Sequence, residues 1–203
     1  METVLTQNKH LITENTIIVS IAAGVSINLL EQYIGSYNSK VVRVMPNALC
    51  SIRESSSVYC VNNRVNEYDE ELVSNLFKNV GLIMKVNEKL MNAFTGFTGS
   101  GPAYVYLFAE ALIDGALKNG IPYNEAKEFA IQTLYGTAKM LKQKKDPIQL
   151  KYQIVTPGGT TIAGLNALEQ NGFRYAVMEA ISQAKKRADD MDELKLKNLK
   201  PKF

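Results

Sequence analysis

Two glycine-rich segments carry the residue types that bind small anions. They run over Thr95–Tyr104 and Thr156–Thr161, and each combines glycines with hydroxyl side chains. Each also precedes an apolar stretch with helical spacing, so backbone N–H groups and hydroxyls are expected at the start of a helix. Because a helix N-terminus carries partial positive charge, the pattern predicts a site for a small carboxylate or phosphate.

The segment Thr156–Thr161 has a structural and a functional interpretation. The structural one is a tight turn, after which Thr160 or Thr161 caps the following helix. The functional one is a carboxylate cradle, in which the backbone around Gly158 and Gly159 and the threonine hydroxyls converge on one anion. Taken alone, the segment favours the structural interpretation, because capping turns are common.

The segment Thr95–Tyr104 is expected to begin a helix, with Ser100 as its cap and Pro102 in its first turn. Its glycines exceed what a helix start requires, since they stand at positions 96, 99 and 101. We therefore expect another chain or a ligand to approach the backbone closely in this segment.

Small and polar residues also follow two apolar runs that we expect to be strands. The residues Ala22–Gly24 come after the run Thr16–Ile21, and Asn47 comes soon after the run Lys40–Met45. In open α/β sheets, ligands bind at the carboxyl ends of the strands. Small side chains there admit a flat ring, and an asparagine can hydrogen-bond an amide. The alternative is an ordinary turn between a strand and a helix.

Glu88 follows Asn87, which is expected to cap a helix. One interpretation is a first-turn acid that favours the helix dipole, and the other is an acid that faces a cationic substrate nitrogen. A serine–histidine–acid triad is excluded because His10 is the sole histidine and lies far from every motif. One histidine with Cys50 and Cys60 also excludes a typical structural zinc site.

Hydrophobic periodicity divides the chain into a part with strands and a helical part. Strands are predicted at 16–21, 40–45, 57–61 and 82–86, with helices at 26–35 and 67–80 between them. Strand signals then end, and helices are predicted around 104–115 and at 123–142, 146–155, 161–170 and 172–193. This order predicts an α/β fold over residues 1–86 and an all-α domain over residues 87–203.

Length and composition describe an ordinary globular chain. Its 203 residues are 46% hydrophobic, and the net charge of +3 is too small to indicate nucleic-acid binding. No apolar run reaches the roughly 18 residues of a membrane span, and residues 1–9 lack a signal core. Two cysteines do not make a disulfide framework, which favours a reducing compartment. The lysine-rich end is expected to be a solvated tail, with Lys195, Lys197, Lys200 and Lys202.

The helical part carries more apolar surface than one copy can bury. About five helices in roughly 115 residues can each cover one face but not two. Aromatic residues nevertheless stand at positions 104, 106, 108, 129 and 135. We therefore expect an obligate homodimer in which the helices of two copies interdigitate.

In combination and in order, these segments resemble the Δ1-pyrroline-5-carboxylate reductases, which catalyse the last step of proline synthesis. The resemblance runs from about Leu5 to Arg187 and rests on the stretches Ser20–Val25, Val42–Asn47, Thr95–Tyr104, Gly136–Lys139 and Val155–Leu165. It implies an incomplete Rossmann-type dinucleotide-binding domain over residues 1–86 and a helical dimerisation domain over residues 87–203. The implied reaction moves a hydride from NADPH or NADH to the C=N bond of 1-pyrroline-5-carboxylate, giving L-proline.

The resemblance also implies roles for individual residues. Those implied at the substrate are Glu88, Thr156, Gly158, Gly159, Thr160 and Thr161. Those implied beside the cofactor are Ala22, Ala23, Gly24, Asn47 and Gln153. The implied site lies between two copies, one supplying the cofactor and the other the threonine loop. No acid–base catalyst is implied, because a protonated imine is already electrophilic and the protein supplies position.

The chain departs from the family pattern at its start. It contains no Gly-x-Gly-x-x-Ala turn, and Glu2–Leu5 aligns with a helix well inside the first domain of the family, so a partial sequence is expected. The alternative is a complete chain that is catalytically incomplete and serves as a dimerisation partner of full-length subunits. The implied form is a cytoplasmic homodimer, with ring assembly and a mitochondrial location left open.

Overall fold

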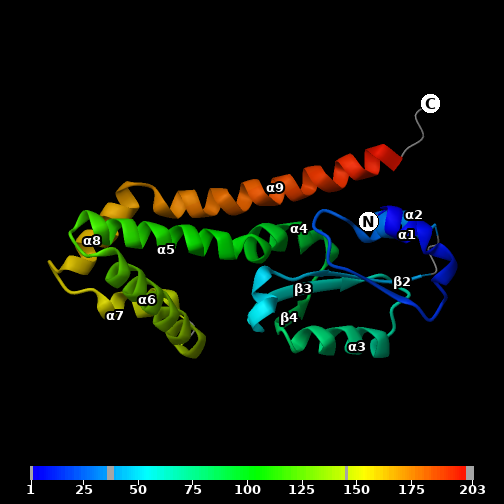
Figure 1. Ribbon diagram of the computed structural model, residues 1–203, viewed down its shortest axis with the longest axis horizontal. Coiled ribbons are helices and arrows are strands. Elements are labelled where there is room, and N and C mark those ends of the chain that lie inside the picture. The colour runs from blue at the N-terminus through cyan, green and yellow to red at the C-terminus, as the bar shows by residue number, and fades with distance from the viewer. Residues whose placement is uncertain (1, 36–38, 145, 200–203) are drawn as a thin grey trace. The chain divides into compact units, whose positions relative to one another are not determined.

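Two compact units make up the structure, a computed structural model that describes residues 2–35, 39–144 and 146–199 (Figure 1). One unit combines Met1–Pro102 with Glu179–Phe203, and the other is Ala103–Met178. The first unit holds the sheet, and the second is helical. The division predicted at residue 87 separates the last strand from the helices that follow it, and it stays a prediction.

The described residues form one four-stranded sheet with the order β1-β2-β3-β4. Its strands are β1 (Ile17–Ser20), β2 (Lys40–Met45), β3 (Ser55–Val61) and β4 (Gly81–Lys85). Each strand overlaps the apolar run that predicts it. The α/β class is therefore confirmed, and the sheet provides the strand ends at which the sequence places a ligand.

The sheet is mixed, because β2 and β3 are antiparallel whereas β1–β2 and β3–β4 are parallel. Each parallel pair is joined by a helix, α2 (Ile27–Ile34) or α3 (Glu67–Lys78). A parallel crossover needs about a dozen residues or more, and only residues 46–54 link β2 to β3. The chain therefore turns back, with a short 3-10 helix at Ala48–Ile52.

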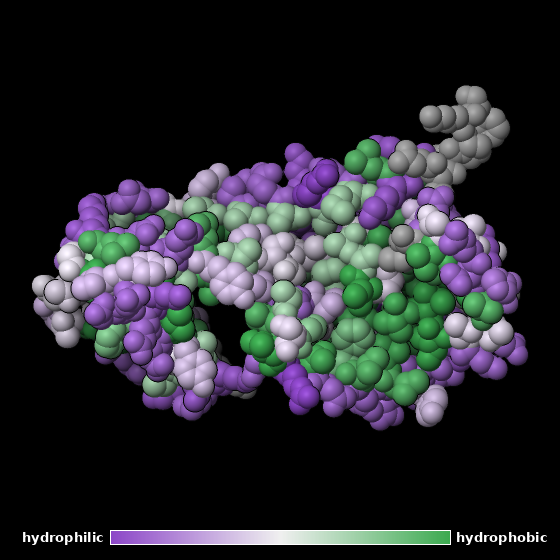
Figure 2. Space-filling model, viewed as in Figure 1, coloured by the Kyte–Doolittle hydropathy of each residue, from purple (hydrophilic) through white to green (hydrophobic). Residues whose placement is uncertain are grey.

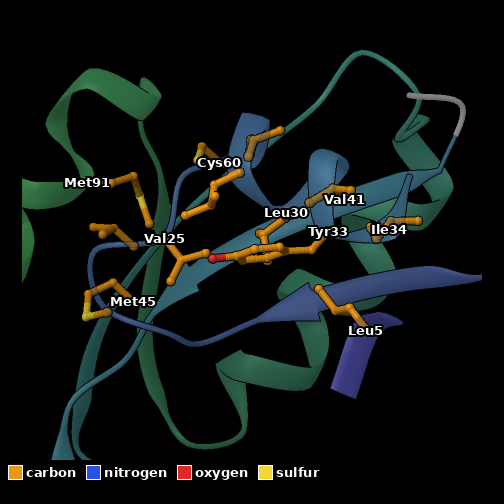
Figure 3. Close-up of a cluster of buried hydrophobic side chains, with 12 residues drawn as sticks. Leu5, Val25, Leu30, Tyr33, Ile34, Val41, Met45, Cys60 and Met91 are labelled. Atoms are coloured by element: carbon orange, nitrogen blue, oxygen red, sulfur yellow. The ribbon is translucent and has the colours of Figure 1, made fainter. Parts of the chain in front are cut away.

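Helices cover both faces of the sheet. Figure 3 shows one core cluster, in which Leu30 and Tyr33 of α2 pack with Val41 of β2 and Leu5 of α1 (Glu2–Gln7). A second cluster joins side chains of α3 to the other face of the sheet, with Val42, Val44, Tyr59, Val73 and Ile83 as its buried members. Because both faces are buried, β2 is an apolar run in the sequence apart from Lys40 and Arg43.

Local capping signals fix the boundaries of the helices in the sheet unit. Ser26 caps α2 by accepting a hydrogen bond from the Leu29 N–H, and Gly35 ends the helix with a φ of 74°. Asn66 and Asp69 form a capping box at the start of α3. These boundaries matter for the site, because Ser26 closes the loop that follows β1.

Helices account for the rest of the described chain after β4. They are a 3-10 helix at Glu88–Leu90, α4 (Met91–Phe94), a π-turn at Thr95–Gly99, α5 (Gly101–Lys118), α6 (Tyr123–Lys144), α7 (Pro147–Ile154), α8 (Thr160–Gln170) and α9 (Phe173–Leu199). Asp146 caps α7, with Pro147 at its first position. No described helix is long and apolar enough to cross a membrane.

Much apolar surface is exposed in both units. Within the fully described helices α5, α7 and α8 no residue is buried, and large side chains such as Tyr106 of α5 and Phe129 of α6 are 62% and 70% exposed. Figure 2 shows apolar surface over the part of the molecule that holds the sheet. Exposed apolar side chains there include Val19, Ile21, Leu82 and Met84, on or next to the two edge strands.

Candidate functional site

The threonine-rich segment forms a tight turn that leads into α8. The Gly159 N–H donates to the carbonyl of Thr156 at 3.0 Å, so Pro157 and Gly158 occupy the two central positions. Gly158 has a φ of +68°, a conformation that favours glycine, and proline followed by such a residue is the type II pattern. The turn therefore explains both Pro157 and Gly158 without a ligand.

Gly159 has a second reason to be glycine. A Cβ at this position would overlap Thr156 Oγ1 and lie 3.2 Å from the Thr156 carbonyl oxygen. The absence of a side chain at Gly159 thus lets the Thr156 hydroxyl lie against the backbone at the mouth of α8. The turn consequently places one hydroxyl at the end of a helix.

The N-terminus of α8 is open among the described residues. Gly159 is the N-cap, and no side chain accepts a hydrogen bond from this end of the helix. The prediction that Thr160 or Thr161 caps α8 is therefore wrong, because the turn places both inside the first helical turn. Since the first N–H groups of a helix lack intrahelical acceptors, those of Thr160 and Thr161 are available to an anion.

Gln153 lies in the last turn of α7 and is exposed, three positions before Thr156. It belongs to the same unit as the turn. The structure thus gathers one group of the predicted residues in the helical unit. A second group lies in the sheet unit, namely Ala22, Ala23, Gly24, Asn47 and Glu88.

The loop after β1 is held by α9. The carbonyls of Gly24 and Ala23 accept hydrogen bonds from Lys195 Nζ at 2.9 and 3.3 Å, and the Ser26 N–H donates to Asp192 Oδ1 at 3.0 Å. Gly24 has a φ of +59°, and a Cβ there would lie 2.8 Å from Met191 Cβ. Close packing on α9 therefore explains why position 24 is glycine.

Asn47 connects the end of β2 to the π-turn. Its side-chain oxygen accepts from the Leu49 N–H at 3.1 Å, and its Nδ2 donates to the Thr98 carbonyl at 3.0 Å. The side chain is thus the N-cap of the short helix after β2 and a tether for the neighbouring segment. Residues Ala22, Ala23 and Asn47 remain partly exposed, and parallel β1 and β2 end at the same edge of the sheet.

Glu88 bridges two parts of the sheet unit. Its Oε1 accepts from the Ile27 N–H at 2.7 Å, in the first turn of α2, and lies 3.6 Å from Nη1 of Arg43. Asn87 caps the short helix that begins with Glu88, as predicted. Glu88 therefore supports the loop after β1 structurally, and its role at a substrate stays a prediction.

Arg43 is the buried centre of a polar network. Its side chain is 2% exposed, and its Nη2 donates to Asn92 Oδ1 at 2.7 Å. Asn92 in turn donates to Asp189 Oδ1 at 2.9 Å, and Lys185 Nζ lies 2.6 Å from Asp189 Oδ2. Partial burial opposes ionisation of Asp189, but the hydrogen bonds from Lys185 and Asn92 outweigh it, so the pKa of this carboxyl is lowered.

The glycines of the π-turn serve contacts within the chain. A Cβ at Gly96 would lie 2.7 Å from the Ile181 carbonyl oxygen, and one at Gly99 would lie 3.4 Å from Met45 Sδ. At Gly96 the close approach is thus made by α9 of this same chain, whereas the contact at Gly99 is an ordinary one and Gly101 has nothing within 4 Å. Packing within this chain therefore accounts for one of the three glycines.

The prediction that Ser100 caps α5 is wrong, because the π-turn runs directly into α5. Ser100 has helical φ and ψ, and its hydroxyl donates to the Thr95 carbonyl at 3.3 Å. The hydroxyls of Thr95 and Thr98 likewise donate to carbonyls one turn earlier. These hydroxyls are engaged with the backbone, so the anion prediction now depends on the segment at the start of α8.

Sequence reasoning missed the contribution of α9. The prediction of a solvated tail is wrong for Lys195, which contacts the loop after β1, and is confirmed for the exposed Lys197. Lys200 and Lys202 lie outside the described residues. One signal was available, because Ala188, Met191, Asp192 and Lys195 follow the spacing of one helical face. Among the described residues, no group of three or more His, Cys, Asp and Glu side chains could hold a metal ion.

Comparison with known proteins identifies relatives over most of the chain. A family model described as pyrroline-5-carboxylate reductase dimerisation matches residues 88–191. Pyrroline-5-carboxylate reductase 3 of Mus musculus is 42% identical over 194 residues, covering 95% of this chain and 70% of the mouse protein. The Pisum sativum reductase is 41% identical over 184 residues, covering 90% and 67% of the two chains.

Solved structures agree with these relatives. The crystal structure of Plasmodium falciparum pyrroline carboxylate reductase with NADP bound has a TM-score of 0.88 and 40% identity, over 94% of this chain and 75% of that chain. The 1-pyrroline-5-carboxylate reductase of Streptococcus pyogenes has a TM-score of 0.84 and 34% identity, over 93% and 73%. The Plasmodium structure shows that a relative with this arrangement of elements binds NADP.

Proposed function

Because the chain belongs to the pyrroline-5-carboxylate reductase family, we propose that it takes part in the reduction of 1-pyrroline-5-carboxylate to L-proline by NADPH or NADH. The reaction consumes one reduced nicotinamide and one proton for each C=N bond reduced. The observation that carries the proposal is the open N-terminus of α8, with the Thr156 hydroxyl beside it. The substrate is an amino-acid precursor with a carboxylate, and this is the ligand that such an end binds.

We assign the substrate carboxylate to the turn before α8. The N–H groups of Thr160 and Thr161, with the hydroxyls of Thr156 and Thr161, would bind its oxygens, and the α8 dipole adds about 0.3–1 kcal/mol. Gly158 and Gly159 shape the turn that makes these groups available. Gln153 is assigned to the same ligand region, because it lies one turn earlier on an exposed surface.

We assign the nicotinamide to the edge of the sheet formed by Ala22, Ala23, Gly24 and Asn47. The fit is supported by two observations, the small and partly exposed side chains after β1 and the asparagine at the end of the adjacent strand. The bound nicotinamide supplies the hydride. The small side chains after β1 leave room for the nicotinamide ring at the carboxyl ends of the strands. Glu88 supports the loop after β1 by accepting a hydrogen bond from the Ile27 N–H.

We further propose that the chain acts as a homodimer in the cytoplasm. The matched family model concerns dimerisation, and the apolar faces of α5 and α6 include exposed Tyr106, Phe129 and Tyr135. In the dimer, one copy would supply the nicotinamide edge and the other the threonine turn. Both cysteines are free, which suits a reducing compartment. Cell fractionation tests the location, and recovery with mitochondria would contradict it.

A substrate titration of the Thr161→Ala variant tests the proposed function. The chain is purified, its oligomeric state is measured, and oxidation of NADPH is followed with and without pyrroline-5-carboxylate. Because residues 1–203 contain no Gly-x-Gly-x-x-Ala turn for the pyrophosphate, the parent used in the assays carries such a dinucleotide-binding segment in front of this chain, and proline is its expected product. Loss of the Thr161 hydroxyl is expected to raise KM for pyrroline-5-carboxylate several-fold, with KM for NADPH changed less.

Thr137→Ala is the matched control, because Thr137 is an exposed helical threonine whose hydroxyl donates to the Thr133 carbonyl. It is expected to keep both KM values of the parent. An unchanged KM for pyrroline-5-carboxylate in Thr161→Ala would contradict the carboxylate assignment. If the parent chain forms no proline but co-purifies with a full-length reductase subunit, the proposed activity is wrong for this chain alone.

A further inference from the structure

One face of α9 packs on the loop between β1 and α2. The residues involved, Ala188, Met191, Asp192 and Lys195, recur at the spacing of adjacent helical turns. Ala188 is 3% exposed, and Leu196 packs against the core cluster beneath α2. This part of α9 and the loop belong to the same compact unit, so their contacts lie within one body.

The contacts are mainly to backbone atoms of the loop. Lys195 Nζ reaches the Gly24 and Ala23 carbonyls at 2.9 and 3.3 Å, and Asp192 Oδ1 accepts from the Ser26 N–H at 3.0 Å. Within the loop itself, the Ala22 N–H to Ser20 Oγ contact is longer, at 3.4 Å. The loop backbone is therefore oriented largely by α9, from the side of Lys195 and Asp192.

We propose that Asp192 and Lys195 are positioning residues for the hydride-transfer step. They fix the backbone of Ala22–Ser26, and this inference rests on the proposed function, in which that backbone lies against the nicotinamide. The carbonyls of Ala23 and Gly24 are directed to Lys195, which sets the orientation of both peptide groups. Hydride transfer needs the reacting atoms about 3–3.5 Å apart, and a displacement of about 1 Å costs roughly 100-fold in rate.

Paired variants of the two residues separate this role from a general effect on folding. Lys195→Met keeps the aliphatic stem and removes the ammonium, and Asp192→Leu removes the acceptor for the Ser26 N–H. Lys195→Arg and Asp192→Asn restore a donor and an acceptor. Lys197→Met is the matched control, because Lys197 lies on the same helix but is exposed and pairs only with the exposed Glu193 among described residues.

Amide hydrogen exchange of the parent and the variants, without cofactor, is the first measurement. Asp192→Leu is expected to speed exchange of the Ser26 amide by about tenfold, since a hydrogen bond is worth about 0.5–1.5 kcal/mol. Lys195→Met is expected to speed exchange at neighbouring loop amides, whereas amides of β2 and β3 should keep the parent rates. Parent rates throughout the loop in both variants would overturn the inference.

Steady-state kinetics of the same proteins is the second measurement. We expect Lys195→Met and Asp192→Leu to lower kcat by about tenfold and to leave KM for pyrroline-5-carboxylate within about twofold of the parent value. In Lys195→Arg and Asp192→Asn, kcat is expected to return toward the parent value. A faster-exchanging loop with parent kcat would overturn the inference while leaving the proposed function standing. A parent chain that binds no NADPH and makes no proline would instead overturn the proposed function, and the inference with it.

Discussion

Substituting Gly96 by alanine tests whether the π-turn is shaped by α9. Gly96 is buried and its φ lies outside the left-handed region, so alanine meets no backbone strain there. The added Cβ would lie 2.7 Å from the Ile181 carbonyl oxygen and 2.8 Å from the Lys185 backbone nitrogen. Both are backbone atoms of a helix, so neither can rotate away, and α9 or the π-turn must shift.

Gly99 provides an internal control in the same turn. A Cβ at Gly99 would lie 3.4 Å from Met45 Sδ, which is an ordinary contact with the end of a flexible side chain. Replacing glycine by alanine in a helical segment gains about 0.5–1 kcal/mol, and this gain is common to both positions. The difference between the two variants therefore isolates the close approach of α9.

The expected difference in unfolding free energy is about 1–3 kcal/mol, the usual cost of forcing extra atoms into a packed core. At a urea slope of about 2 kcal/mol per M, a difference of about 2 kcal/mol separates the midpoints by about 1 M. Both variants are compared at the same protein concentration, because association shifts apparent stability. We expect Gly96→Ala below the parent and Gly99→Ala at or above it.

Equal midpoints for Gly96→Ala and Gly99→Ala would refute the reasoning, since the packing of α9 on the turn would then carry no energetic consequence. This includes an equal loss of unfolding free energy in both variants, which would indicate that the π-turn tolerates no Cβ at either position. A lower slope in only one variant would point to a change in cooperativity rather than in contact energy.

Three further predictions concern a thiol, a carboxyl and a helical glycine. Burial, with the Glu88 charge, raises the pKa of the Cys60 thiol to about 12. Iodoacetamide at about pH 8 should therefore label only Cys50 in the native chain and both thiols after denaturation. Detection of labelled Cys60 in the native chain by mass spectrometry would contradict this prediction. The lowered pKa of Asp189 predicts a stabilising contribution, at most about 1 kcal/mol because the group is partly exposed, that is present at neutral pH and lost as the pH falls through the folded-state value. Urea midpoints of the parent and Asp189→Asn should therefore differ at neutral pH and converge in acid. Gly136 of α6 has nothing within 4 Å, so Gly136→Ala should raise the thermal midpoint, and weaker dimerisation by sedimentation would show instead that a second copy approaches there.

Boundaries of elements were predictable where a short-range signal sets them. Ser26 and Gly35 mark the ends of α2 by a hydroxyl cap and a left-handed glycine, and both effects act within one turn of the chain. The run Lys40–Met45 is a strand over its whole length, because burial on two faces leaves an apolar pattern that only Lys40 and Arg43 interrupt. In each case the residues that decide the structure are neighbours in the sequence.

Other features depended on geometry that residue types do not reveal. The pairing of β2 and β3 is antiparallel because residues 46–54 are too few for a parallel crossover. The apolar patterns of the two strands do not by themselves specify their relative direction. At α8, the sequence predicts Thr160 or Thr161 as N-cap, but the turn at Pro157–Gly158 makes Gly159 the N-cap. The threonine side chains therefore do not cap α8, because the turn places Gly159 at the N-cap position.

The contribution of α9 to the site could not be predicted from local patterns. Asp192 and the Ser26 N–H that it accepts are 166 residues apart in the sequence, and Lys195 and Gly24 are 171 apart. Arg43 was read only as part of a strand, although its side chain connects Glu88 to Asn92. Pairings of this kind need a folded chain, because nothing near either residue in the sequence specifies the other.

The glycines, considered together, narrow the location of the anion site. Gly24 and Gly96 are required by close packing on α9, whereas Gly99 makes an ordinary contact with Met45 and Gly101 has nothing within 4 Å, so packing explains the loop after β1 and part of the first glycine-rich segment. At the second segment, packing explains only how Gly159 admits the Thr156 hydroxyl, and the helix end beyond it stays uncapped among the described residues. The first N–H groups of α8 lack intrahelical acceptors, so we expect the anion to bind at the start of this helix.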